Sequence, residues 1–85
     1  MDLDEIWLFI ARHDPDAADK YVDALGERML LLADHPGIGR SCDHLAPDLR
    51  RFPFDDYIVF YTDTEDAIVI ERILHGARDI ENLLD

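Results

Sequence analysis

The sequence has little of several features that mark particular classes of protein. Its single cysteine, Cys42, excludes an internal disulfide and fits a reducing compartment. Purely apolar runs such as residues 29–33 are far shorter than the roughly 18 residues that a membrane-spanning helix needs. Residues 1–5 lack the basic start of a secretory signal. We therefore expect a cytoplasmic protein that makes no membrane contact.

Positive charge is also scarce. Twenty Asp and Glu residues face eight Lys and Arg residues, which gives a formal net charge of −12. A field of this sign repels phosphate backbones, so we expect no direct binding of nucleic acid. The basic residues are nevertheless unevenly placed, and Lys20 is the only lysine among them. Five arginines lie from residue 40 onward, where an arginine-lined face could form despite the negative net charge: Arg40, Arg50, Arg51, Arg72 and Arg78.

The chain is long enough for one domain, residues 1–85, and its 48% of hydrophobic residues suffice for a core. Apolar residues at helical spacing, Leu3, Ile6, Trp7 and Ile10, predict a first amphipathic helix. A second, longer helix should begin at Asp14-Pro15, a helix cap followed by proline, and end at residues 35–37. Two helices joined by a short turn form a helical hairpin.

The pattern changes in the second half of the chain. Residues 38–48 have neither a helical nor a strand period and read as a loop. Strands are predicted over residues 49–54, 57–61 and 67–74, the first of them an edge strand at best because of Pro53. Asp79 should cap a short final helix with Ile80, Leu83 and Leu84 inward. The predicted fold class is α+β, a helical hairpin packed on a small three-stranded antiparallel sheet.

Five segments, in this order and at this spacing, resemble the RelE/ParE superfamily of bacterial type II toxin–antitoxin toxins, and its ParE branch in particular. They are DLDEIWLFIA, DPDAADKYVDAL, LADHPGIGR, APDLRRFPFDDYIVFY and IERILHGARD. The resemblance covers nearly the whole chain. Family members usually have a strand ahead of the first helix, and we expect this chain to lack that strand. A sheet without it would offer an open edge to which a partner could add a strand.

The resemblance implies three alternative functions. The ParE branch inhibits DNA gyrase by binding it, which needs no catalytic residue and no cofactor. The RelE branch cleaves messenger RNA on the ribosome, which needs a base, an acid and cations at one phosphate. Its candidates here are Tyr57, Arg72, His75 and Arg78, with Tyr61 weighed beside them. The set looks incomplete because the position where that branch tends to place an arginine corresponds to Tyr57. The third alternative is an inactive member that only binds its antitoxin.

Partner contacts follow from the same resemblance. We expect Arg72, His75 and Arg78 to form the face that binds the target. Each also has an ordinary structural interpretation, such as an ion pair or a solvated helix-end charge. A cognate antitoxin should wrap the hairpin and the sheet. Its likeliest contacts are apolar and aromatic residues that could equally belong to the core: Trp7, Tyr21, Leu31, Phe52 and Phe54.

A metal centre is the weakest alternative. His35, Cys42 and His44 lie close together in sequence, but structural zinc normally takes four ligands. Nothing near Cys42 in the sequence would activate its thiol, so it is not a candidate nucleophile. We expect neither a metal nor a cofactor.

Overall fold

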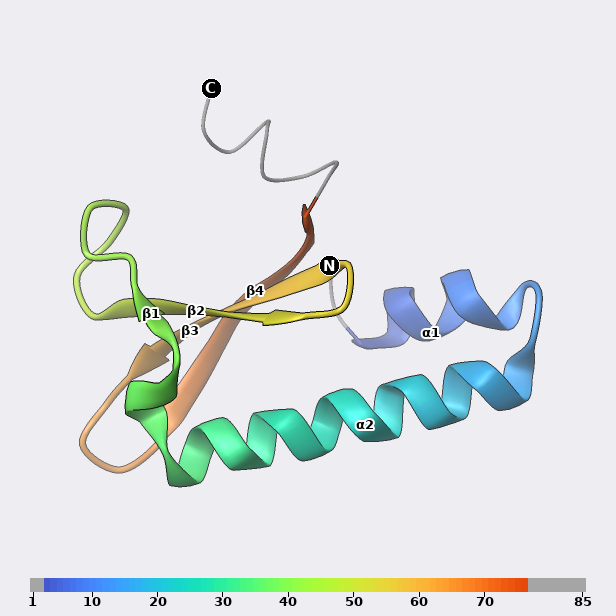
Figure 1. Ribbon diagram of the computed structural model, residues 1–85, viewed down its shortest axis with the longest axis horizontal. Helices are drawn as coiled ribbons and strands as arrows, with labels where there is room; N and C mark the ends of the chain where they lie inside the picture. The colour runs from blue at the N-terminus through green and yellow to red at the C-terminus, as the bar shows by residue number, and fades with distance from the viewer. Residues whose placement is uncertain (1–2, 77–85) are drawn as a thin grey trace.

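The computed structural model describes residues 3–76 of the chain, in which a helical hairpin packs against an antiparallel sheet (Figure 1). Helices α1 (Leu3–Ala11) and α2 (Pro15–Asp34) are followed by a single 3-10 turn, η1 (Pro36–Ile38). Four strands complete the described part of the fold: β1 (Arg40–Ser41), β2 (Leu49–Phe54), β3 (Tyr57–Asp63) and β4 (Ile68–His75). The predicted α+β fold class is confirmed. The final helix predicted from Asp79, with Ile80, Leu83 and Leu84, lies outside the described residues, as does Arg78.

The start of α2 forms as its sequence predicts. The Asp14 side chain accepts a hydrogen bond from the Ala17 amide at 3.1 Å, and Pro15 occupies the first turn, where a missing N–H costs nothing. Helix α2 is the longer helix and extends well beyond α1 (Figure 1). It can therefore contact both α1 and the sheet.

The sheet has one strand more than the sequence indicated. Its order is β1-β2-β3-β4, and every neighbouring pair is antiparallel. The prediction of three strands with residues 49–54 at the edge was wrong, because the two residues of β1 pair with Arg51 and Arg50 of β2. Pro53 lies past this short pairing, so its missing N–H interrupts no bond to β1.

The two faces of the sheet have different roles. Tyr57, Val59 and Tyr61 of β3 are buried with Ile6, Leu25 and Leu32 of the hairpin, which forms the main core. The opposite face, which we call the outer face, carries Phe60 and a smaller cluster with Cys42 and Leu74. Because successive side chains of a strand alternate between faces, the register assigns every strand residue to one side or the other.

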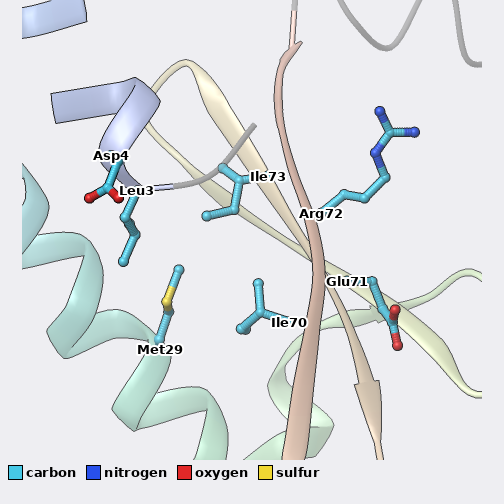
Figure 2. Close-up of a pocket in the computed structure, with 7 residues that line it drawn as sticks. All are labelled: Leu3, Asp4, Met29, Ile70, Glu71, Arg72 and Ile73. Carbon is cyan, nitrogen blue, oxygen red and sulfur yellow. The ribbon is translucent and has the colours of Figure 1, made fainter. Parts of the chain in front are cut away.

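A β-bulge in β4 changes this alternation. Phe60 pairs with Arg72, but the next residue, Tyr61, pairs with Ile70, so Glu71 is an extra residue on β4. Ile70 before the bulge and Ile73 after it therefore both face the hairpin, although they are three residues apart (Figure 2). The bulge leaves Glu71 and Arg72 side by side on the outer face (Figure 2).

Candidate functional site

The residues predicted for RNA cleavage or target binding are divided between the two faces. Tyr57 and His75 are paired across β3 and β4 on the hairpin face, with ring centroids 5.5 Å apart at an interplanar angle of 82°. Only 5% of Tyr57 is exposed. Arg72 lies three residues before His75 and extends from the other side of β4 (Figure 2). The structure thus brings Tyr57 and His75 together and separates both from Arg72.

Tyr61 is a structural residue in the core. It is fully buried, and its hydroxyl donates a hydrogen bond to the carbonyl oxygen of Pro36 at 2.6 Å. The same hydroxyl accepts one from the Gly39 amide at 2.9 Å. These two bonds fix the backbone that connects α2 to the sheet. The Tyr61 hydroxyl is therefore fully used in holding this connection.

An aromatic cluster surrounds Tyr57 at the turn between β2 and β3. Tyr21 of α2 makes edge-to-face contacts with Phe54 and Tyr57, at centroid distances of 5.4 and 6.0 Å. Burial raises the pKa of the Tyr21 hydroxyl well above its usual range, and the nearby carboxylates of Asp55 and Asp56 raise it further. Tyr21 is also hydrogen-bonded to Asp55, which adds to the rise. At neutral pH the Tyr21 hydroxyl is thus protonated, and its hydrogen bond to Asp55 links α2 to the turn between β2 and β3.

The five residues expected to contact an antitoxin do not form one surface. Tyr21, Phe52 and Phe54 are partly buried and pack against the main core. The indole Nε1 of Trp7 donates a hydrogen bond to the Asp19 carboxylate at 2.7 Å, which links α1 to α2. Leu31 alone is exposed, at 37% of its surface. Most of this set therefore has a structural role, and its part in partner binding stays a prediction.

Exposed apolar residues of α2 fit a partner contact better. Leu30 is 69% exposed and Leu31 37%, whereas Leu32 beside them is fully buried. Leu30 and Leu31 thus point away from the core face of α2. Exposed leucines next to each other at the end of a helix offer an apolar surface that this core does not use.

A groove lies between the hairpin and β4, which is an edge strand of the described sheet (Figure 2). It has a volume of about 410 Å³ and is lined by Leu3, Asp4, Met29, Ile70, Glu71, Arg72 and Ile73. Figure 2 shows Leu3, Met29, Ile70 and Ile73 directed into the groove, and Glu71 and Arg72 directed away from it. Strand β4 is the last strand in the described sheet. The backbone N–H and C=O groups along its edge therefore adjoin this groove. Sequence reasoning anticipated an open edge but not these side chains, because their meeting depends on how the hairpin crosses the sheet.

The loop residues weighed as metal ligands do not converge. Cys42 is 1% exposed and packs with Phe60 and Leu74, as a small apolar residue does. Within residues 3–76, no three His, Cys, Asp or Glu side chains lie close enough together to hold a metal ion. None of the helices in this part of the chain combines the length and the apolar character of a membrane span.

Residues 3–76 define a class of small α+β protein with an apolar groove beside the edge strand β4, and Tyr57 and His75 lie on the opposite face from Arg72. The family model for the ParE toxin of the type II toxin–antitoxin system parDE matches residues 1–80, and the chain belongs to that family.

Curated relatives agree with this assignment. The chain is 33% identical over 84 residues to Toxin ParE1 of Mycobacterium tuberculosis, in strains CDC 1551 / Oshkosh and ATCC 25618 / H37Rv. That similarity covers 96% of this chain and 86% of the relative. Toxin ParE1 of Caulobacter vibrioides is 32% identical over 75 residues, which cover 87% of this chain and 77% of the relative. The resemblance to the ParE branch is thereby confirmed.

Proposed function

We propose that this ParE-family toxin inhibits DNA gyrase in the cytoplasm by binding to it, and that a cognate ParD-like antitoxin neutralises it. The observation that carries the proposal is the separation of Arg72 from Tyr57 and His75 onto opposite faces of the sheet. Gyrase inhibition by protein binding needs surfaces rather than an assembled catalytic set.

RNA cleavage needs an arrangement of catalytic side chains that the described residues do not provide. A base, an acid and a cation must surround one phosphate within hydrogen-bond reach. Tyr57 is 5% exposed and lies against Tyr21 of the hairpin, so its ring faces protein rather than an open site. Arg72 is exposed on the other face. This division favours protein binding over catalysis.

The groove beside β4 is the surface that we propose for the antitoxin. An extended antitoxin segment would form backbone hydrogen bonds with the open edge of β4, which is a common way for a sheet to bind a peptide. Its apolar side chains would contact Leu3, Met29, Ile70 and Ile73 in the groove. The exposed Leu30 and Leu31 would extend this contact along α2.

Gyrase supercoiling in vitro tests the proposal. The purified chain should inhibit supercoiling in a concentration-dependent manner, and the product of the neighbouring antitoxin gene should relieve the inhibition. The target contacts that we propose are Arg72, His75 and Arg78. Arg72→Gln and Arg78→Gln should weaken inhibition while circular dichroism shows an intact fold. Supercoiling inhibition that persists in both variants would remove these two residues from the mechanism.

The other two functions predict different results in the same experiment. A ribosome-dependent ribonuclease would arrest growth on expression and leave supercoiling unchanged, with cleaved messenger RNA in the cells. A member that only binds its antitoxin would leave both growth and supercoiling unchanged. Either result contradicts the gyrase proposal, and the two are told apart by growth alone.

A further inference from the structure

Three arginines lie in one line across the outer face of the sheet. The register pairs Arg40 with Arg51, Arg51 with Phe60, and Phe60 with Arg72. Residues directly opposite each other on antiparallel strands have their side chains on the same face. The line therefore crosses all four strands of the described sheet, with Phe60 between Arg51 and Arg72. We call these residues, Arg40, Arg51, Phe60 and Arg72, the arginine row.

The side chains of the arginine row are not used to hold the fold together. Arg40 and Arg72 are exposed and Arg51 is half-buried, and none of the three guanidinium groups forms a hydrogen bond or ion pair with another residue of the described chain. Arg50 behaves differently, since its Nη1 donates to the carbonyl oxygen of Gly39 at 2.8 Å. Two like charges directly opposite each other, as in Arg40 and Arg51, destabilise a sheet. Arg40 and Arg51 thus repel each other, and no carboxylate of the described residues forms an ion pair with either of them.

Apolar hollows adjoin the arginine row on both sides. One, of about 490 Å³, is lined by Arg40 and Arg51 together with Ile38, Phe52, Pro53 and Ile58. The other, of about 320 Å³, is lined by Arg72 with Leu45, Leu49, Phe60 and Glu71. Each guanidinium group therefore borders a place for an apolar side chain. A ligand that matched this face would carry apolar groups between its negative charges.

At physiological salt the screening length is about 8 Å, so the outer face responds mainly to the carboxylates nearest to it. The hairpin, which carries many of the acidic residues, is packed on the other side of the sheet. Two sets of carboxylates do lie near the row. Glu71 accepts a hydrogen bond from Thr62 at 2.8 Å. Asp43, Asp48 and Asp63 line a separate hollow beside Leu49. These acids limit the basic surface to the row itself.

We propose that the outer face is a docking surface for an acidic polypeptide segment, whose carboxylates pair with the arginine row and whose apolar side chains enter the two hollows. Neighbouring strands are about 4.8 Å apart, so Arg51 and Arg72, two strands apart, select carboxylates roughly 10 Å apart. Arginine is suited to carboxylates because its planar group donates two parallel hydrogen bonds. A nucleic acid fits less well, because its continuous phosphates would meet the Asp43, Asp48 and Asp63 cluster.

Fluorescence anisotropy with the purified full chain tests this surface without gyrase or antitoxin, so the result is independent of the supercoiling assay. The probe is a fluorescein-labelled peptide of alternating Glu and Leu residues. Arg51→Gln/Arg72→Gln should weaken peptide binding about tenfold or more, because charge-assisted hydrogen bonds are lost. The matched control, Arg12→Gln/Arg28→Gln, removes the same charge from exposed positions of the hairpin and should change binding by less than about twofold.

Each remaining outcome decides against the docking surface. Equal weakening by both double variants would mean that only net charge matters. An absence of peptide binding by the unaltered chain at low and physiological salt would overturn the proposal outright. Tighter binding of an oligouridine of equal charge, lost in Arg51→Gln/Arg72→Gln, would assign the row to RNA. Thermal unfolding followed by circular dichroism must show that both double variants are folded.

Discussion

The hydroxyl of Tyr61 occupies the space that a side chain at residue 39 would need, and it accepts a hydrogen bond from the Gly39 amide at 2.9 Å. Gly39 has a φ of −70°, which any residue adopts, so close approach rather than backbone conformation requires glycine there. The contact joins the end of the helical hairpin to the centre of the sheet.

Gly39→Ala should destabilise the domain by about 1–3 kcal/mol, because the new methyl group would overlap the buried Tyr61 ring. Urea unfolding measures the change. Gly37→Ala is the matched control, since no atom lies within 4 Å of the position that its methyl group would take. We expect the control to stay within about 0.5 kcal/mol of the unaltered chain. Equal unfolding free energies for the two variants would contradict the close contact.

Leu25 and Leu30 offer the same substitution on one helix with opposite burial. Leu25 is fully buried and Leu30 is 69% exposed. Leu25→Ala should lower the free energy of unfolding by about 2–5 kcal/mol through lost burial and a residual cavity. Leu30→Ala should change it by less than about 0.5 kcal/mol. If the proposed antitoxin contact is correct, Leu30→Ala should instead weaken antitoxin binding, which calorimetry of the complex measures.

The stability of the fold should fall in alkaline solution through Tyr21. Burial and the neighbouring carboxylates raise its pKa in the folded state, so the unfolded chain loses this proton first as the pH rises. The stabilisation that comes from the raised pKa of Tyr21 is fully present below about pH 10, the usual tyrosine pKa. It is lost progressively as the pH rises above that value. Tyr21→Phe should therefore show a shallower decline of unfolding free energy between about pH 9 and pH 11. Parallel declines in the two proteins would exclude Tyr21 as the cause.

Tyr57→Phe separates the proposed function from RNA cleavage. Phenylalanine keeps the ring that contacts Tyr21 and His75 but lacks the hydroxyl, which is the group of the Tyr57 side chain that could transfer a proton. Growth arrest on expression should persist in a folded Tyr57→Phe variant, because gyrase binding needs no proton transfer. Loss of growth arrest together with loss of messenger RNA cleavage would instead support the ribonuclease alternative.

Local sequence signals predicted the helices well. The Asp14-Pro15 start of α2 depends on groups within one turn, and the structure has the helix begin at Pro15. Strand β1 was missed because two residues are too few to show an alternating pattern, and Arg40–Ser41 is a strand only through its pairing with β2. Its absence from the prediction also hid the pairing of Arg40 with Arg51.

The candidate site was harder to predict, and for two different reasons. The separation of Arg72 from His75 was available from the sequence, because residues three apart on a regular strand lie on opposite faces. The groove was not available, since the meeting of Leu3 and Met29 with Ile70 and Ile73 depends on the crossing of α2 over the sheet. The arginine-lined face was predictable only in part. The composition indicated that such a face could exist, but only the strand register shows which arginines share it.

The extra residue at Glu71 divides β4 into two segments that are out of phase with each other. In the first, residues 68 and 70 face the core, and in the second, residues 73 and 75 do so. Deleting one residue here would bring both segments into a single phase and turn one of them over, exposing core residues and burying charge. Point substitutions at Glu71 leave the phase unchanged. The chemistry of this strand's two surfaces is therefore governed by the number of residues in it, and we expect length at this point to be more constrained than residue type.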